Sequence, residues 1–374
     1  MNQDVFVVAD NVLSPLGKTT AENFDQLKKN ISGVKEQNNP AISPKSFFAA
    51  LFSEGDINIE SGKTKFEQLL IDSIADALQN SGIDPTDKKT ILIVSSTKGN
   101  ISLLETEEHT AELEKRIALS TSARLVAEHF GFVNRPIIIS NACISGVMGI
   151  ITGMRLLRTG QYENAVVAGA DVISSFILSG FESFQALSPQ VCKPFDKSRD
   201  GLNLGEGAAT IVLSTNKRYA QNTKVLGGAV SNDANHISGP SRTGKELSFA
   251  IDQSLKEAGL STDDIDFISA HGTATPYNDE MEAKAIHLCQ LQSVPLNSLK
   301  GYYGHTLGAA GLIESIISIQ SLRGGLLLPT PGYSESGVTQ PVNVVAGLQP
   351  IQAKNFLKTG SGFGGCNAAV IFGK

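Results

Sequence analysis

The sequence has few cysteines and no excess of basic residues. Cys143, Cys192, Cys289 and Cys366 are scattered and include no CxxC pair. This spacing argues against a disulfide framework and a zinc site, and it favours a protein that works in a reducing cytoplasm. The formal net charge is −6 at pH 7, and no long run of Lys or Arg is present. The composition therefore does not indicate nucleic-acid binding.

The sequence also lacks an apolar run long enough to cross a membrane. The longest such stretch, Ile137–Leu157, is interrupted by Asn141, Arg155 and glycines, so it predicts a strand, a turn and a helix. The first residues lack the basic and apolar regions of a signal peptide. We therefore expect a cytoplasmic protein without a membrane span.

The abundant residue types indicate a compact α/β protein. Hydrophobic residues make up 41% of the 374 residues, charged residues make up 18%, and there are 36 glycines. This balance is typical of a folded chain with tight loops. The length leaves room for two domains with separate cores, or for one large layered domain.

Three blocks of sequence recur in the same order in the two halves of the chain. The aligned pairs are Cys143–Ile151 with His305–Ile313, Ile71–Ile83 with Ile251–Leu260, and Ala208–Val212 with Ala368–Phe372. In the first pair both glycines are in register. This self-similarity predicts a duplicated βαβ-type unit, with two similar mixed sheets packed through helices.

The boundary between the halves is predicted in the polar stretch Asn216–Thr223. We therefore divide the chain into residues 1–219 and 220–374. The first half is longer between Gly82 and Cys143, and the glycine-free segment Glu105–Lys115 is the expected insertion.

Three turns of glycine and small residues each carry a reactive side chain. Cys143 follows the apolar run Pro136–Ile139, His271 follows Asp266–Ser269, and His305 begins an apolar helical pattern. A cysteine with two histidines suits thioester chemistry, because a thiolate attacks an acyl carbon and neutral imidazoles stabilise an enolate oxygen. The combination predicts a site that forms carbon–carbon bonds.

Cys143 is expected at the N-terminus of a helix. Free backbone N–H groups and the helix dipole favour the thiolate at such a position. A lone intracellular cysteine is more often a buried structural residue. The alignment of its turn with that of His305 favours a reactive role, since duplicated turns direct two reactive groups to one place.

His271 is expected at the end of a buried strand. The following Gly-Thr-Ala-Thr-Pro continues neither a strand nor a helix. Binding sites form at such sheet edges, although a lone histidine there is more often structural. Thr273 and Thr275 provide hydroxyl groups for a polar ligand. His236, in a polar loop, is a weaker candidate for the same site.

His305 is expected at the N-terminus of a helix, where the dipole disfavours the imidazolium. A neutral imidazole that donates a hydrogen bond is suited to stabilising an enolate. Lys300 is the nearest cation in the sequence, and its alternative interpretation is a solvated surface lysine. Glu282, on a helix that starts near Asp279, is a possible partner for Lys300.

With these motifs in this order, the chain resembles the β-ketoacyl-acyl-carrier-protein synthases, the elongating condensing enzymes of the thiolase superfamily. The resemblance spans the chain. It is carried by Val5–Gly17, the Cys143 turn, Lys193–Gly201 with Gly205–Gly207, His271–Pro276, Lys300–His305 and Gly362–Gly365.

The resemblance implies a thiolase-like duplicated fold, layered αβαβα, with two mixed five-stranded sheets. It also implies a role for each matching residue. The Cys-His-His set falls on Cys143, His271 and His305, the family's lysine on Lys300, its acid on Glu282, and its aromatic gate on Phe363. The backbone N–H groups of Phe363 and Cys143 would form the oxyanion hole.

The implied activity is that of an acyltransferase in fatty-acid, polyene or polyketide biosynthesis. Cys143 accepts an acyl group from acyl-carrier protein, malonyl-carrier protein loses CO2, and the two histidines stabilise the enolate. The carbanion then attacks the Cys143 thioester to give a 3-oxoacyl product. No metal or redox cofactor is expected, because the acyl groups arrive on the phosphopantetheine of the carrier. A homodimer, or a heterodimer with a related subunit, is also implied.

The chain departs from the family pattern at three places. Cys366 stands where threonine is usual, and Lys193 stands where arginine is common. The chain is also shorter between Gly99 and Phe130, a region that shapes the dimer interface and the acyl pocket in the family. The resemblance therefore does not predict a preferred acyl-chain length.

Two other functions are compatible with parts of the sequence. A thiolase would need a second reactive cysteine near the C-terminus, and Cys366 lies in the right region. A non-catalytic chain-length partner of a heterodimeric synthase would typically lack the nucleophile, whereas Cys143 and both histidines are present here. The two-histidine set and the Gly-Phe-Gly-Gly motif favour the synthase.

Overall fold

A mixed ten-stranded sheet forms the frame of the molecule. The computed structural model describes residues 3–235 and 237–374, so His236 lies outside the described residues. The strand order is β11-β10-β14-β15-β9-β1-β8-β6-β4-β5. The bounds are β1 Phe6–Leu13, β4 Thr90–Ser95, β5 Ile137–Ile139, β6 Asn164–Asp171, β8 Gly207–Ser214, β9 Lys224–Asn232, β10 Phe267–Ser269, β11 Leu296–Asn297, β14 Asn355–Gly362 and β15 Cys366–Gly373.

The sheet consists of two equivalent five-stranded halves. In β5-β4-β6-β8-β1 the first two pairings are parallel and the last two are antiparallel. The sequence β11-β10-β14-β15-β9 repeats this pattern. The halves meet where β1 runs beside β9, through the pair Phe6–Lys224. The predicted duplication into two mixed five-stranded units is therefore confirmed, and the two units join edge to edge in one sheet.

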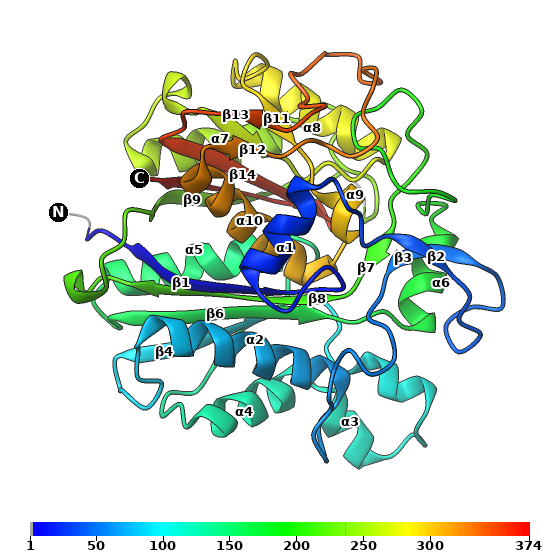
Figure 1. The fold of residues 1–374 in the computed structure, drawn as a ribbon, viewed down its shortest axis with the longest axis vertical. Helices are drawn as coiled ribbons and strands as arrows, with labels where there is room; N and C mark the ends of the chain where they lie inside the picture. Colours follow the sequence, from blue (N-terminus) through cyan, green and yellow to red (C-terminus); the bar gives the residue numbers. More distant parts are fainter. Residues whose placement is uncertain (1–2, 236) are drawn as a thin grey trace.

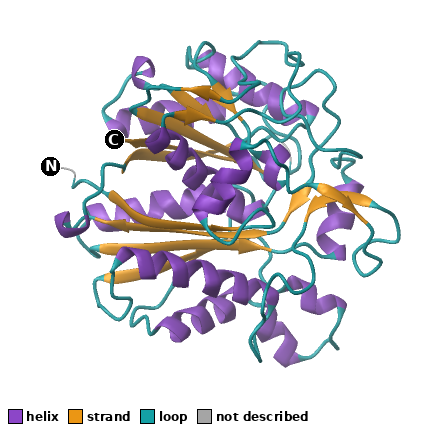
Figure 2. Cartoon of the chain, viewed as in Figure 1, coloured by secondary structure: helices purple, strands orange, loops and turns teal. Residues whose placement is uncertain are grey.

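Helices cover both halves of the sheet and fill the space between them (Figure 1). Helices α2 and α4 lie on the outside of the first half, and α7 and α8 on the outside of the second. Helices α5 and α10 pack against each other between the halves. Figure 2 shows the resulting alternation of helix and strand layers. The helix bounds are α1 Thr20–Lys28, α2 Lys65–Ser81, α3 Ala111–Ile117, α4 Leu119–Phe130, α5 Ser145–Arg158, α6 Ser175–Ser183, α7 Lys245–Ala258, α8 Pro276–Leu288, α9 Lys300–Tyr303 and α10 Ala310–Gly324.

The central helices approach closely because small residues face each other at their N-terminal ends. A Cβ atom on Gly146 of α5 would lie 2.7 Å from the backbone N of Leu312 and 2.9 Å from the carbonyl oxygen of Gly308. No side chain fits into that space without movement of the backbone. Both central helices follow turns that carry predicted reactive residues, so this contact brings the Cys143 and His305 turns together.

Smaller elements complete the fold. Strands β2 (Lys35–Gln37), β3 (Phe47–Ala50) and β7 (Leu204–Gly205) form one small sheet, and β12 (Leu326–Leu327) pairs with β13 (Gln349–Pro350). The connection from β4 to β5 contains α3 and α4, whereas the equivalent connection from β10 to β11 contains α8. The expected insertion, Glu105–Lys115, therefore overlaps α3. Within residues 3–235 and 237–374, no helix has the length and apolarity needed to cross a membrane.

Candidate active site

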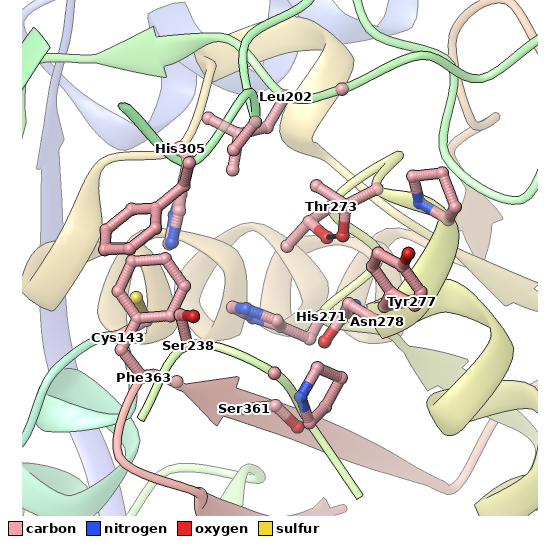
Figure 3. Close-up of a pocket in the computed structure, with 18 of the residues that line it drawn as sticks. Cys143, Leu202, Ser238, His271, Thr273, Tyr277, Asn278, His305, Ser361 and Phe363 are labelled. Carbon is pink, nitrogen blue, oxygen red and sulfur yellow. Dashed lines mark hydrogen bonds between the residues drawn. The ribbon is translucent and has the colours of Figure 1, made fainter. Parts of the chain in front are cut away.

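Cys143, His271 and His305 line one cavity of about 400 Å³. Figure 3 shows the cysteine sulfur and the two imidazole rings on the same wall of this cavity. Cys143 comes from the turn between β5 and α5, His271 follows β10, and His305 lies between α9 and α10. Both halves of the duplicated fold therefore contribute to the site.

Local hydrogen bonds fix the turn that carries Cys143. Ala142 has a positive φ of 44°, a conformation that is uncommon for residues other than glycine. The Ser145 hydroxyl donates to the carbonyl oxygen of Ala142 at 2.6 Å and accepts from the backbone N–H of Asn141 at 2.8 Å. These contacts hold the strained turn in place and present Cys143 to the cavity.

Burial, rather than the helix end, sets the resting charge of Cys143. Desolvation raises the pKa of its thiol to about 12, with a further contribution from Cys366, while Lys300 opposes the shift. The expectation that the N-terminus of α5 favours the thiolate is therefore wrong for the resting site. Removing a sulfur anion from water costs free energy, so burial favours the protonated thiol.

The turn between β14 and β15 packs directly onto Cys143. A Cβ atom on Gly362 would lie 2.9 Å from the backbone N of Cys143, so glycine permits this contact. The backbone N–H of Phe363 is directed at the Cys143 sulfur and lowers its pKa. Donors placed in this way are suited to stabilising an oxyanion beside the sulfur.

The ring of Phe363 borders the cavity within an aromatic cluster from α6. Its centroid lies 5.6 Å from that of Phe181 in a stacked arrangement, and 5.2 Å from that of Phe184 in an edge contact. Phe363 is 36% exposed. The ring is therefore partly exposed and lines the same cavity as Cys143.

The backbone before and after His271 is held by charged side chains. Its N–H donates to Glu282 Oε1 at 2.8 Å, and the N–H of Gly272 donates to Glu282 Oε2 at 2.8 Å. Its carbonyl oxygen accepts a hydrogen bond from Lys300 Nζ at 3.1 Å. Glu282 and Lys300 thus position the His271 turn rather than line the cavity themselves.

Both histidines are kept neutral by their surroundings. Desolvation, followed by the charge of Lys300, lowers the pKa of His271 and of His305 well below 6.5. Their ring centroids are 5.4 Å apart, with the planes at 81°. Among the described residues, buried His305 Nδ1 has no hydrogen-bond partner. Two neutral imidazoles in this arrangement can both donate hydrogen bonds to one oxygen atom that gains negative charge.

The structure decides against the alternative interpretation of Lys300 and against its possible partner. Lys300 is fully buried rather than solvated, and its ammonium group pairs with Glu314 of α10 rather than with Glu282. Glu282 is occupied by backbone N–H groups and by the Thr359 hydroxyl, which donates to it at 2.5 Å. Glu314 lies nine residues beyond His305 in an apolar helix, and the sequence interpretation did not identify it.

Thr273 and Thr275 both line the cavity, as expected. Their hydroxyl oxygens lie 2.8 Å apart and hydrogen-bond to each other. The adjacent Tyr277, at the start of α8, also lines the cavity and is 79% exposed. Figure 3 shows Thr273 near Tyr277 and Asn278.

Further parts of the wall were not predicted. They come from segments without a recognisable motif, including the loop after β9 and helix α6. The residues concerned are Phe181, Phe184, Gln185, Ser238, Gly239, Pro240 and Ser361. A buried lysine next to the site, Lys358, was also missed. Its signal was a charged residue directly after Phe356-Leu357, in the segment that precedes the Gly-Phe-Gly-Gly turn.

Cys366 lies behind the Cys143 turn and is not among the residues that line the cavity. Its thiol approaches the carbonyl oxygen of Phe363 at 3.5 Å, and burial raises its pKa to about 11. This position is unsuited to a base that must reach substrate. Among the described residues, no group of three or more His, Cys, Asp or Glu side chains is arranged to hold a metal ion.

Comparison with known families identifies the chain. It matches the N-terminal domain of β-ketoacyl synthases over residues 2–218 and the C-terminal domain over residues 223–334. The chain belongs to the β-ketoacyl synthase family. It is therefore a condensing enzyme of the acyltransferase class with a thiolase-like fold.

Curated relatives cover most of the chain. A 3-oxoacyl-[acyl-carrier-protein] synthase 2 from Vibrio cholerae is 30% identical over 410 residues, covering 98% of each chain. A putative polyketide β-ketoacyl synthase 1 from Streptomyces cyaneus is 32% identical over 276 residues, covering 70% of this chain and 65% of the relative.

Solved structures share the whole fold. A ketosynthase in complex with its chain length factor from Xenorhabdus doucetiae has a TM-score of 0.89 at 26% identity, covering 99% of this chain and 98% of its own. The ishigamide ketosynthase/chain length factor has a TM-score of 0.90 at 25% identity and covers 100% of both chains.

Proposed function

We propose that this β-ketoacyl synthase condenses an acyl group held on Cys143 with malonyl-acyl-carrier protein to give 3-oxoacyl-acyl-carrier protein. One observation carries the proposal. A buried cysteine and two neutral histidines line the same cavity, with a backbone N–H directed at the sulfur. This arrangement provides a nucleophile, an oxyanion site and two enolate donors without further groups.

The first stage is acyl transfer to Cys143. Its sulfur attacks the acyl carbon, the bond from that carbon to the carrier's pantetheine sulfur breaks, and the thiol proton of Cys143 leaves with the departing carrier thiol. The N–H groups of Cys143 and Phe363 stabilise the tetrahedral oxyanion. Because the resting sulfur is protonated, loss of the proton accompanies the attack rather than preceding it.

The second stage forms the carbon–carbon bond. Malonyl-carrier protein loses CO2, and the electron pair of the broken bond becomes an enolate whose oxygen faces His271 and His305. The enolate carbon then attacks the Cys143 thioester. The bond to Cys143 breaks, the 3-oxoacyl product stays on the carrier, and the sulfur recovers a proton.

The remaining residues support these steps. Lys300 and Glu282 hold the His271 turn from opposite sides, and their role is positioning. Thr273 and Thr275 line the cavity, where their hydroxyl groups would bind the polar arm of phosphopantetheine. Phe363 is proposed as the gate to the acyl pocket.

The proposal includes partners and organisation. Acyl-carrier protein delivers both substrates, and the chain works in the cytoplasm as a homodimer or with a related subunit. The solved relatives that are complexes of a ketosynthase with a chain length factor support pairing with such a subunit. No cofactor beyond the carrier's phosphopantetheine takes part. We retain residues 1–219 and 220–374 as the two halves.

Reconstitution tests the proposal. The protein is incubated with acyl-carrier protein bearing a fatty-acyl group and with malonyl-carrier protein, and the 3-oxoacyl product and CO2 are measured. We expect both from the unaltered protein and no condensation product from Cys143→Ala. Cys289→Ala is the matched control, because this buried cysteine lies in the outer helix layer. Condensation by Cys143→Ala would refute the assignment of the nucleophile.

A further inference from the structure

A fully buried lysine, Lys358, lies beside the site without touching the cavity. Its Nζ donates hydrogen bonds to three backbone carbonyl oxygens, those of Ser269 and Ala270 at 3.2 Å each and that of Thr359 at 2.7 Å. Its ion pair with Glu314 Oε2 measures 2.7 Å. Every polar partner of this nitrogen is an oxygen atom. Only the protonated amine has three N–H donors, so these partners favour the ammonium form of Lys358.

Lys300 completes the arrangement on the other side of Glu314. Its ammonium group pairs with Glu314 Oε1 and donates to the carbonyl oxygen of His271. The two lysines thereby bind three consecutive carbonyl groups, those of Ser269, Ala270 and His271. The backbone that leads from β10 into His271 is held along its length by two cations that share one carboxylate.

We propose that Lys358 is a positioning residue, a tethered ammonium ion that fixes the backbone entering His271 and places a positive charge beside both imidazole rings. This inference rests on the proposed function, in which His271 and His305 stabilise the enolate. An apolar residue would fill the same volume, but it would remove the hydrogen bonds to three buried carbonyl groups and the positive charge beside Glu314 Oε2.

The charges around the histidines set the expected pH behaviour. Lys358 contributes to the lowered pKa of each ring, after burial and Lys300. Removing a positive neighbour raises the pKa of a histidine, so protonation would begin at higher pH. The titratable and charged groups around the site are Cys143, Asp171, Asp200, Asp233, Asp279, Glu282, Lys300, Glu314 and Lys358.

The first test uses Lys358→Met, which keeps the length of the side chain and removes its charge. We expect decarboxylation of malonyl-carrier protein to fall about tenfold to a hundredfold, because small displacements of a reacting group have effects of this size. Transfer of an acyl group to Cys143 should change far less. The acid limb of the decarboxylation profile should move to higher pH, because a positive neighbour of both histidines is lost. Unchanged decarboxylation with an unchanged pH profile would overturn the proposal.

The second test restores the cation. Lys358→Ala leaves room for a free ion, so ammonium chloride should raise both its melting temperature and its decarboxylation rate in a saturable manner. Choline chloride at the same ionic strength is too large to enter and should do neither. Lys358→Met, with the space filled, should not respond. Equal responses to ammonium and choline, or failure of both variants to fold with ammonium present, would overturn the proposal.

The melting-temperature measurement separates this inference from the proposed function. If the unaltered protein shows no decarboxylation while ammonium stabilises Lys358→Ala selectively, the proposed function fails and the cation site stands. If decarboxylation is normal and ammonium has no selective effect on the variant, the inference about Lys358 fails and the proposed function stands.

Discussion

Replacing His271 by alanine should separate the two chemical stages. The structure places His271 and His305 together, with ring centroids 5.4 Å apart, so the variant loses one of two donors to the enolate oxygen. Loss of one preorganised donor typically costs ~10²–10³ in rate, about 2.7–4 kcal/mol in the barrier. The Cys143 turn is held by Ser145 and Asn141, so its geometry does not depend on His271.

The assay measures both stages in the same preparations. CO2 release from malonyl-carrier protein should fall by ~10²–10³ in His271→Ala, while transfer of a labelled acyl group to Cys143 should stay close to the unaltered rate. His271→Asn, which restores a short N–H donor, should recover part of the decarboxylation. His129→Ala is the control, because His129 is exposed at the end of the outer helix α4.

The opposite distribution of effects between acyl transfer and decarboxylation would refute this reasoning. A His271→Ala or His305→Ala variant that acylates poorly but decarboxylates normally would identify that histidine as the base for Cys143. The high pKa of the buried thiol makes this comparison informative, because a proton must leave the sulfur during acyl transfer.

Burial and nearby cations lower the pKa of His271 and His305, so decarboxylation should stay constant as the pH falls through 6.5, and a loss of rate centred there would contradict this explanation. Gly146→Val, whose Cβ would meet the α10 backbone at 2.7 Å, should lower the free energy of unfolding in urea by at least about 1–3 kcal/mol. Gly180→Ala, whose Cβ would meet nothing within 4 Å, should change the free energy of unfolding by less than about 0.5 kcal/mol. Equal free energies of unfolding for the two variants would argue against the close contact of α5 with α10. Cys366→Ser should retain condensing activity, since this thiol lies outside the cavity, whereas severe loss together with Cys366-dependent thiolysis of acetoacetyl-CoA would favour a thiolase.

The duplicated fold could be predicted because short local patterns of the sequence repeat in its two halves. The turn at Cys143 aligns with the turn at His305 through paired glycines, and one glycine of each pair, Gly146 and Gly311, is needed where α5 meets α10. The strand blocks Ala208–Val212 and Ala368–Phe372 occupy equivalent places in β8 and β15. Repeated glycine spacing and buried strands are visible in a single sequence, and they determine which turns come together.

The charge network under the site could not be predicted in the same way. Glu314 and Lys358 come from segments distant in sequence, and only the packing of α10 against β14 brings them together. The sequence therefore offered only Glu282 as a possible partner for Lys300, whereas the structure pairs it with Glu314. The thiol charge of Cys143 was also misjudged, because the degree of burial that raises its pKa depends on the walls of the cavity. Side-chain pairing and desolvation are tertiary properties without a local sequence pattern.

The central claim is that Cys143 carries the acyl group, and that the enolate formed by malonyl decarboxylation removes this group from the sulfur. Mass spectrometry of the intact protein after incubation with acyl-carrier protein measures this directly. We predict one added acyl group, mapped to Cys143 by peptide analysis and absent in Cys143→Ala. It should be lost as 3-oxoacyl-carrier protein when malonyl-carrier protein is added. An acyl group on Cys366, or one on Cys143 that persists while CO2 is released, would contradict the claim.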